Sequence, residues 1–567
     1  MNAFSTNKKR TFSAAAQWGP LIAGLSILFS AQISAAQDKG WEEGGEIRDV
    51  NIEIVKERQI TLPQANRNFE KVPPRPSEPI RPPMTYSFQS FNFQAPQVNP
   101  AIRPLKLKQQ SSSDIYGNYV RIGYGNYASP LLEAYLNSRK DRNKLLGAHF
   151  YHQSSGKGPV DGKNSGSGTT GLSLSARSVG EDLSLSGNAA FENRSTTFYG
   201  YPAGMEVDKD SIKQAFNLFK LSGELSNSKN SDFAYTFGAG FSYLGDKFSA
   251  SETEIDLDFK LSYKMDEESR INLSAGYAMI SRKDDKVEGD PRSLFTVSPS
   301  YVFSPVENLT VTAGLALAFE NDTIDSKNIH VYPDFKVSYP VSPSVDFVAH
   351  LGGGMEKVSL QTLSNENLWL APNVPIFHTS KNIDFGAGIN ARLGNKISIN
   401  TGLALASLKH WYYFMNSPDN QAKFDVVYDD GATKRTNFFA ALSYAQSEMV
   451  KVMLRGDVFG YDTDELDKAY HRPTYKFTAN ASFNLYQKLI FKADLIAQGG
   501  MKAYDFTADK NVTLDAAFDL NFKTEYLFSK SFSAFVQLNN ITSNKYPVFL
   551  HYPVRGFQAM AGITWSF

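Results

Sequence analysis

Alternation of apolar and polar residues with a period of two recurs along the chain from residue 113 to its end. In one such segment, apolar residues alternate with polar ones. The apolar residues are Phe518, Leu520, Phe522, Tyr526 and Phe528, and the polar ones are Asp519, Asn521, Lys523 and Glu525. A period of two is typical of a β-strand whose two faces have different surroundings. The segments 255–263 and 475–485 alternate in the same way. Because a charge at every second position cannot face lipid, the polar face must contact water or polar protein.

The number and spacing of these segments predict how they assemble. Counting them gives about 22 strands, within a range of about 20 to 24, and bacterial barrels prefer an even number. Short connections such as 265–269 and 393–395 alternate with long ones such as 193–210, 363–381 and 410–436. Periplasmic turns and extracellular loops differ in length in this way. We therefore predict an all-β fold, a transmembrane antiparallel β-barrel over residues 113–567.

Composition excludes several other classes of protein. Hydrophobic residues make up 42% of the chain, and the mean hydropathy is -0.34. Outside the N-terminus no run approaches the ~18 to 20 apolar residues of a spanning helix. Lys and Arg number 58, and Asp and Glu number 58, so nothing indicates a nucleic-acid partner. The chain has no cysteine, which excludes disulfides and thiolate metal sites.

Residues 1–36 have the pattern of a secretory signal peptide. Lys8, Lys9 and Arg10 precede an apolar stretch over 18–31, and Ser34-Ala35-Ala36 forms a small-residue cleavage site. The stretch is short and is interrupted by glycine and proline, which argues against a membrane anchor. We expect cleavage before Gln37 and export to the outer membrane of a Gram-negative cell.

Residues 37–112 are predicted to form an extended periplasmic tail. Val50, Ile52 and Ile54 alternate with polar residues, and such a strand without a partner can add to the edge of another protein's sheet. Ten prolines follow between Pro63 and Pro104, a composition that stays extended. Phe88, Phe91 and Phe93 could dock on a partner or on the barrel rim. The tail is either a solvated linker or a docking peptide for a periplasmic protein.

The C-terminal strand adds a more specific signal. From Phe557 the odd positions are apolar and the even ones mostly polar, and the strand ends on Trp565 and Phe567. A terminal aromatic resembles the signal that the barrel-assembly machinery of the outer membrane recognises. The preceding segments 536–546 and 552–557 resemble the end of TonB-dependent receptors, in which an Asn-Leu-Thr-like strand, a Tyr and a Pro-Gly-Arg-like loop precede the last strand.

One part of that family's pattern has no counterpart in this sequence. TonB-dependent receptors carry a folded N-terminal plug with glycine-rich motifs, and residues 37–112 cannot accommodate one. The segment 49–56 is only weakly similar to a TonB-contacting box, so contact with TonB stays an open question. A barrel of this size encloses a wide lumen. We expect inward-folded loops, the tail or a separate partner protein to close it.

The predicted lumen face carries both signs of charge. The residues are Asp256, Asp258, Lys260, Lys451, Arg455, Asp457, Lys523 and Glu525. Unpaired buried charges would be costly, so we expect them to be paired or hydrated. Since neither sign dominates, a polar wall holding water is favoured over an ion-selective filter.

No motif for catalysis or for a cofactor is present. The sequence has no Gly-x-Ser-x-Gly elbow, His-Glu-x-x-His pair or phosphate loop, so we expect neither an enzyme nor a bound cofactor. The histidines are scattered, and the loop carboxylates Asp429 and Asp464 could hold calcium or be solvated. The aromatic residues Trp369, Trp411, Tyr412, Tyr413 and Tyr552 either belong to an interfacial girdle or form an extracellular surface for a ligand.

Two functions follow from these features. In the first, the protein is an outer-membrane transport conduit gated by a partner or by its own loops. In the second, it is a non-transporting scaffold whose N-terminal tail recruits periplasmic proteins.

Overall fold

The computed structural model describes residues 117–567 except 139–142, 203, 229–230 and 323–327. The predicted signal peptide and tail, with Val50, Ile52, Ile54, Phe88, Phe91 and Phe93, lie outside these residues. The long strands are β1 (Tyr119–Gly125), β2 (Ser129–Asn137), β3 (Lys144–Ser155), β4 (Ser167–Val179), β5 (Leu183–Thr197), β6 (Lys213–Asn227), β7 (Phe233–Asp246), β8 (Ser251–Lys264), β9 (Arg270–Asp284), β11 (Arg292–Val306), β12 (Leu309–Glu320), β13 (Ile329–Ser342), β14 (Val345–Glu356), β15 (Thr379–Leu393), β16 (Ile397–Lys409), β19 (Ala432–Gln446), β20 (Val450–Asp462), β21 (Tyr475–Leu485), β22 (Leu489–Gly499), β25 (Ala517–Leu527), β26 (Phe532–Asn539) and β29 (Gln558–Ser566).

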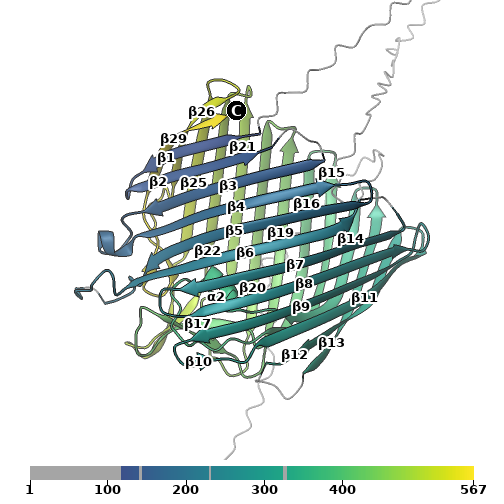
Figure 1. Ribbon diagram of the computed structural model, residues 1–567, viewed down its shortest axis with the longest axis horizontal. Helices are drawn as coiled ribbons and strands as arrows, with labels where there is room; N and C mark the ends of the chain where they lie inside the picture. The colour runs from purple at the N-terminus through teal and green to yellow at the C-terminus, as the bar shows by residue number, and fades with distance from the viewer. Residues whose placement is uncertain (1–116, 139–142, 203, 229–230, 323–327) are drawn as a thin grey trace, which may run out of the picture. The chain divides into compact units, whose positions relative to one another are not determined.

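These strands form one closed antiparallel barrel of 22 strands (Figure 1), which confirms the predicted fold class and strand number. The two-residue β10 (Val287–Glu288) extends the sheet beside β9. The ring closes where β29 pairs with β1, with Tyr119 opposite Ser566 and Gly125 opposite Met560. Backbone hydrogen bonds of 3.1 Å in both directions between Asn118 and Phe567 extend the closing seam.

The closing seam requires a residue without a side chain at position 562. A Cβ atom there would collide with the carbonyl oxygen of Ile122 and would lie 2.6 Å from the ring of Phe535. Phe535 fills this space and is 2% exposed, while the Arg121 guanidinium lies 4.1 Å above its ring. Gly562 therefore lets an aromatic ring pack directly against the last strand.

The alternation in the sequence separates the two faces of the barrel. On β6, Phe219 and Leu221 point outward and are 42% and 52% exposed. The next residue, Ser222, belongs to the inner wall. The outer face of the last strand carries Trp565 and Phe567, whose rings stack with centroids 4.5 Å apart. This outward apolar belt is the surface that lipid covers in a transmembrane barrel.

The connections at the two ends of the barrel differ in length. One end, here the short-turn end, carries tight connections such as 180–182, 307–308 and 394–396. The other, the long-loop end, carries 156–166, 198–212, 357–378, 410–431, 463–474, 500–516 and 540–557. The connections 126–128 and 247–250 are short exceptions at that end. In outer-membrane barrels short turns face the periplasm and long loops face outward.

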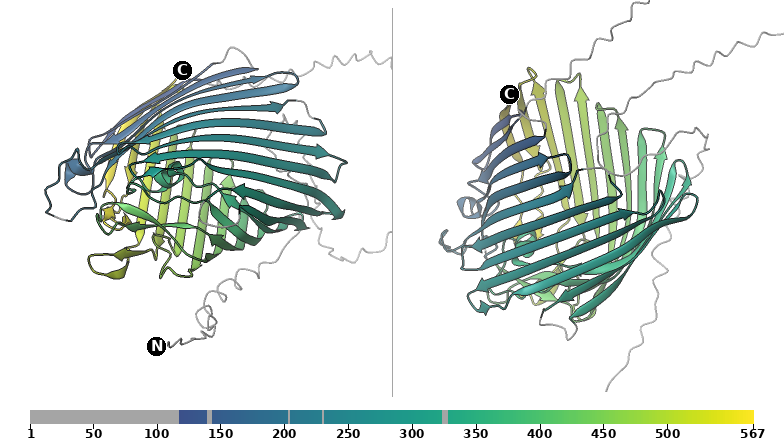
Figure 2. Two further views of the ribbon diagram at one scale, coloured as in Figure 1. Left: turned by 60° about the horizontal axis from the view of Figure 1, so that its bottom comes forward. Right: turned by 45° about the vertical axis from the view of Figure 1, so that its right-hand side comes forward.

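The long loops contain secondary structure of their own. They hold the 3-10 helix η1 (Gly162–Ser165), the helix α2 (Leu360–Glu366) and three hairpins, β17 (Tyr412–Asn416) with β18 (Phe424–Tyr428), β23 (Lys502–Asp505) with β24 (Lys510–Thr513), and β27 (Pro547–Phe549) with β28 (Tyr552–Pro553). Figure 2 shows α2 within the ring of strands. Within the described part of the chain, no helix is both long and apolar enough to cross a bilayer.

Candidate functional site: the loop core inside the barrel

Four long loops turn into the barrel and pack on one another and on its inner wall. The buried apolar residues of this contact, here called the loop core, come from connections 198–212, 357–378, 410–431 and 540–557 and from the wall strands. They are Tyr199, Phe216, Leu218, Leu244, Ala250, Val358, Leu360, Leu363, Leu370, Val374, Ile376, Phe414, Phe424, Val426, Phe549 and Tyr552. Because Leu363 and Phe424 are 0% exposed, the core is dry, like the interior of a soluble domain.

Aromatic rings form the centre of the loop core. The rings of Trp369 and Tyr552 lie with centroids 4.1 Å apart, and Phe549 meets Trp369 edge-on at 6.0 Å. The indole Nε1–H of Trp369 donates to the carbonyl oxygen of Thr197 at 2.9 Å, and the Tyr552 hydroxyl donates to the carbonyl oxygen of Ala422. Each polar tip is therefore satisfied while its ring is buried. These contacts join three of the four loops to one another and to the end of β5.

The barrel wall fastens the beginning of helix α2. The carboxylate of Glu252 on β8 accepts the backbone N–H groups of Leu360 and Gln361 at 2.7 and 2.9 Å. Ser359 caps the same end reciprocally with Thr362. The first turn of a helix leaves free N–H groups and carries partial positive charge, so a carboxylate is a suitable partner. Glu252 is 2% exposed, so its charge is committed to this contact.

Charged groups fix both ends of the loop 357–378. At its start, the ammonium group of Lys357 contacts the carboxylates of Glu254 and, at 2.5 Å, Asp256 on β8. At its end, the backbone N–H of His378 donates to Asp322 at 2.6 Å. Asp322 in turn accepts from Arg292 Nε at 2.6 Å and from Arg292 Nη2 at 3.0 Å. Such a forked pair is directional as well as strong.

The imidazole of His378 completes this arrangement. Its Nδ1 accepts from the backbone N–H of Val358 and from Arg292 Nη2, both at 3.1 Å, so the ring is neutral and its proton sits on Nε2. Burial lowers the pKa of His378 to about 4, and the nearby Arg292 acts in the same direction, against the effect of Asp322. A neutral His378 therefore holds the start and the end of the loop together.

His471 has a similar role between three other loops. Its Nδ1–H donates to the carbonyl oxygen of Phe414 at 2.8 Å, and its Nε2 accepts from the Leu550 N–H at 3.3 Å. Burial lowers the pKa of His471 to about 4, although the Phe414 carbonyl opposes the shift. Both buried histidines thus favour the packed loops in their neutral form.

Arg472 connects helix α2 to the aromatic hairpin. Its Nη1 donates to Glu366 at 2.7 Å and its Nη2 donates to the Tyr412 carbonyl oxygen at 2.9 Å. Its guanidinium also lies 4.5 Å from the ring centroid of Trp411. A guanidinium can form hydrogen bonds at its edge and stack on a ring at once. One side chain therefore couples three loops.

The structure corrects the interpretation of the aromatic residues. Trp369, Trp411, Tyr412, Tyr413 and Tyr552 do lie in the long loops, as predicted, but Tyr413 and Tyr552 are 0% exposed. These two contribute neither to an exposed ligand surface nor to a lipid-facing girdle, because the loops fold inward and bury them. Trp369, Trp411 and Tyr412 are partly exposed, and binding of a ligand to them stays a prediction.

The predicted lumen charges all lie on inward-facing strand positions, and several are paired. Arg455 Nη2 lies 2.8 Å from Asp457, and Lys523 lies 3.5 Å from Glu525, both along a single strand. Asp256 binds Lys357, as described above, whereas Asp258 is exposed to the lumen. Lys260 and Lys451 are exposed as well.

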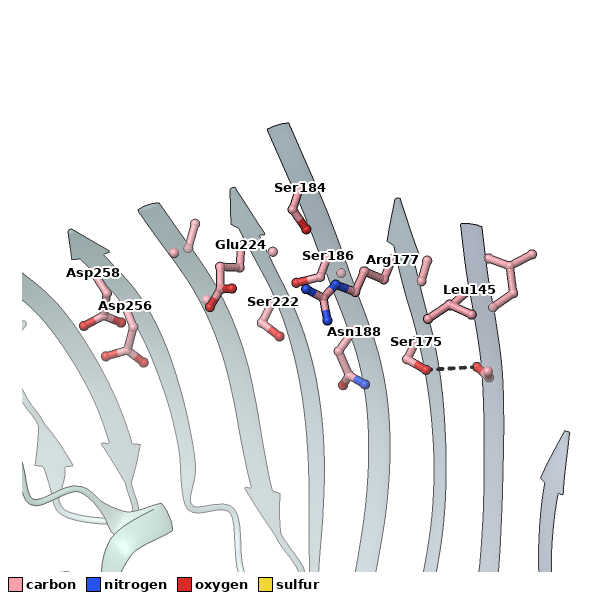
Figure 3. A pocket seen from close by; sticks show the side chains of 18 of the residues that line it. Leu145, Ser175, Arg177, Ser184, Ser186, Asn188, Ser222, Glu224, Asp256 and Asp258 are labelled. Atoms are coloured by element: carbon pink, nitrogen blue, oxygen red, sulfur yellow. Dashed lines mark hydrogen bonds between the residues drawn. The ribbon is translucent and has the colours of Figure 1, made fainter. Parts of the chain in front are cut away.

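Below the loop core the inner wall is hydrophilic. A cavity of about 840 Å³, here called the acidic cavity, lies against β2 to β8 toward the short-turn end. Figure 3 shows Glu224, Asp256 and Asp258 on one side of it and Arg177 among serine and asparagine side chains on the other. Glu224 and Arg177 are exposed, so this part of the wall is wet.

The loop carboxylates have a structural explanation. Asp429 accepts backbone N–H groups of Asp464, Glu465 and Leu466 at 2.8, 2.9 and 3.1 Å. These hydrogen bonds order the start of the loop 463–474. Across the residues that the structure describes, no group of three or more His, Asp or Glu side chains is arranged to hold a metal ion.

The residues that matter most for the loop core were not singled out in the sequence. Glu252, Arg292, Asp322, His378 and Arg472 make its buried polar contacts. A weak signal existed, since Glu252 begins a run of four acidic residues at alternate positions on β8, with Glu254, Asp256 and Asp258. Their partners lie 20 to 109 residues away in sequence, and no local pattern indicates them.

Comparison with known proteins identifies the fold. No protein-family model matches the chain, and no curated protein matches it in sequence. Among solved structures, the FrpB iron transporter from Neisseria meningitidis (F3-3 variant) is similar with a TM-score of 0.62 and 10% identity, over 80% of this chain and 81% of that one. The ferric-catecholate import receptor Fiu from E. coli K12 gives a TM-score of 0.61 and 9% identity, over 80% and 82%.

The siderophore receptor PirA from Acinetobacter baumannii is similar to the same degree, with a TM-score of 0.62 and 8% identity over 79% of this chain and 80% of that one. A closed barrel with an apolar outer belt and a hydrophilic inner wall defines an outer-membrane β-barrel protein. Its barrel has the fold of the TonB-dependent receptors, which confirms the resemblance seen at the C-terminus. At these identities the similarity concerns the fold.

Proposed function

We propose that the protein is an outer-membrane uptake conduit whose outer mouth is held shut by its own loops. The loop core carries this proposal, because 16 buried apolar residues from four loops and the wall fill the lumen at the long-loop end. The fold supports the transport class, since FrpB is described as an iron transporter and Fiu as an import receptor. A conduit gated in this way admits solute only after the loops rearrange.

The polar contacts support a movable closure. The loop 357–378 is attached through Lys357, His378 and the start of α2, and each contact is a hydrogen bond or an ion pair with the wall or a neighbouring loop. Such contacts can be exchanged for water when the loop leaves, and the apolar side chains of the loop, among them Leu360, Leu363 and Leu370, must leave the loop core at the same time. The hydrophilic wall below would then offer a wet path.

Single-channel conductance in planar bilayers tests this proposal. Replacing residues 358–377 with a short Gly-Ser linker should convert a closed protein into a permanently conducting one, because Leu360, Leu363 and Leu370 leave the core. A matched control shortens the hairpin 502–513, which contributes no residue to the loop core, by the same method and should stay closed. If the loop variant folds and still does not conduct, closure by this loop is wrong.

A covalent lock separates a conduit from a scaffold. The chain has no cysteine, and the Ser242 Oγ and Gln361 Oε1 atoms are 3.4 Å apart, so a short, reducible thiol crosslinker can join the side chains of S242C and Q361C. Locking α2 to the wall should abolish solute uptake into cells, and reduction should restore it. If locked cells grow and take up solutes as before, the scaffold function is favoured.

We also propose that residues 37–112 bind a periplasmic partner. Val50, Ile52 and Ile54 supply a candidate edge strand, and Phe88, Phe91 and Phe93 supply apolar anchors. Pull-down with the full mature chain and with a variant lacking 37–112 tests this. Capture of the same proteins by both forms would contradict it.

A further inference from the structure

A second cavity lies at the long-loop end, where the closing strand β29 meets the first strands of the barrel. It measures about 320 Å³, and we call it the arginine cavity. Its wall includes Ser129, Gln153, Thr169 and Gln558, and Arg555 enters from the loop 540–557. Leu368, two residues beyond helix α2, lines it as well. The gating loop 357–378 therefore forms part of this cavity.

Arg555 is the one charged residue that lines the arginine cavity. Within the described residues, no carboxylate lies within the 4.0 Å of an ion pair from its guanidinium. Contacts of its backbone set its position, because Asn540 Nδ2 donates to the Arg555 carbonyl oxygen at 2.8 Å. Burial lowers the pKa of Arg555, with Tyr199 and Tyr127 acting in the opposite direction. A partly desolvated cation without a counter-charge is costly unless an anion joins it.

The other polar side chains of the cavity are neutral and able to donate hydrogen bonds. No partner occupies the side chains of Gln153 and Gln558 among the described residues. Asn539 uses its Oδ1 to accept from Gln537 at 3.1 Å, so its amide N–H groups stay available. Carboxylates and phosphates accept from such donors, and a guanidinium fork matches their paired oxygens.

The acidic cavity provides the contrast. It has Glu224, Asp256 and Asp258 against Arg177, whereas the arginine cavity has a cation and no carboxylate. Both lie on the wall of the same barrel, so the difference does not come from the fold. The difference in charge between the two cavities comes from the identity of the side chains at inward-facing strand positions and in the loops.

We infer that the arginine cavity binds a small organic anion through a carboxylate or phosphate group held by Arg555. The volume suits a compact molecule, since it is at the lower end of ligand pockets of about 300 to 1,000 Å³. An occupant would touch Leu368 and so contact the gating loop. The role of this anion as substrate or trigger rests on the proposed function, but its binding does not.

Isothermal titration of the full chain in detergent tests the inference. The probes are citrate for a carboxylate ligand and glycerol 3-phosphate for a phosphate ligand, with choline as a cationic control. At least one anion should bind, R555Q should weaken it at least tenfold, and R555K should weaken it less because it keeps the charge. The matched control R177Q removes an arginine from the acidic cavity and should bind as the unaltered chain does.

Any of three results would overturn the inference. The first is that neither anion binds the unaltered chain, and the second is that R555Q binds an anion as tightly as the unaltered chain does. The third is that choline binds as well as the anions. Folding of each variant is checked by the mobility of the unheated barrel on a denaturing gel. Should R555Q not fold, Q153L keeps Arg555 and removes a donor. It should weaken binding several-fold, and unchanged affinity would contradict the site.

Binding and gating can fail separately. If anions bind but the loop replacement does not conduct, the cavity stands and the proposed closure is wrong. If the loop replacement conducts but no anion binds, the closure stands and the anion site is wrong.

Discussion

The two halves of the lumen are built from the same strands but have opposite character. Near the long-loop end, Phe216 and Leu218 on β6 belong to the dry loop core. Toward the short-turn end of the same strand, Ser222 and Glu224 line the wet acidic cavity. The strand β8 changes similarly, from Glu252, which is 2% exposed, to the exposed Asp258.

The inner face of this barrel therefore does not have one environment along its whole length. Its polar groups are hydrated where the lumen is open and must be individually satisfied where loops exclude water. A charged side chain in the upper half therefore contributes to the packing of the loops, whereas one in the lower half faces solvent. Substitutions that differ only in depth should then differ greatly in effect.

The largest difference between the two halves should come from replacing one arginine in each of them. R292A leaves the buried carboxylate of Asp322 without its forked partner, and breaking a buried pair costs about 3 to 5 kcal/mol. The gating loop should open, which hydrogen exchange of residues 357–378 and planar-bilayer conductance would detect. The lower-half control R177A, whose side chain is exposed, should leave both unchanged. Equal effects of the two would remove the distinction between the halves.

Acid should open the loops by a somewhat smaller amount. The pKa of His378 is about 4 in the packed state and near 6.5 when exposed, so the closed form is fully favoured above pH 6.5 and loses stability as the pH falls toward 4. The shift corresponds to about 3 kcal/mol. Protonation of Nδ1 would break the bonds from Val358 and Arg292 and place a cation beside Arg292 and near Lys357.

Conductance or exchange measured between pH 7 and 4 checks the direction, with H378Q as the comparison. Asp322 does not contribute in this range, because Arg292 lowers its pKa despite burial and the carboxylate stays ionised above pH 4. His471 contributes independently, so H378Q should reduce the acid response without abolishing it. Loops that tighten in acid would contradict this account.

The helix cap should have a moderate effect. S359A removes the side-chain oxygen that accepts from the Thr362 N–H, and loss of such a cap costs about 1 kcal/mol. Faster exchange should be confined to α2, since Glu252 still satisfies the first N–H groups. S222A, on the wall of the acidic cavity, is the matched control. An unchanged exchange rate at α2 would show that the cap does not stabilise the loop.

The smallest effect should come from the lower wall. D258N removes an exposed carboxylate, so thermal stability should change by less than about 0.5 kcal/mol. In the loop-replaced conducting form, the same change should make the current only slightly less selective for cations, because Glu224 and Asp256 remain. A large loss of selectivity would instead reveal a filter.

The sequence alone determined the barrel. A side-chain period of two is local, so strand number, the lipid-facing positions and the lengths of the connections could be read without knowing which strands pair. The segment with Trp565 and Phe567 likewise indicated the last strand of an outer-membrane barrel, and the structure then showed that this strand pairs with β1. Each of these features depends only on neighbours in sequence and on the contrast between oil and water.

The burial and the contacts of the loop residues, in contrast, depend on the folded barrel. The sequence around Tyr413 and Tyr552 does not show whether these side chains are buried or exposed. Both are buried by contacts between loops, and the Tyr552 hydroxyl bonds to a residue 130 positions away. The pairing of Arg292 with Asp322 and His378, and the lack of a carboxylate beside Arg555, are equally nonlocal. Irregular loops have no repeating sequence pattern from which their contacts could be predicted. Their packing depends on the shape of the lumen that surrounds them.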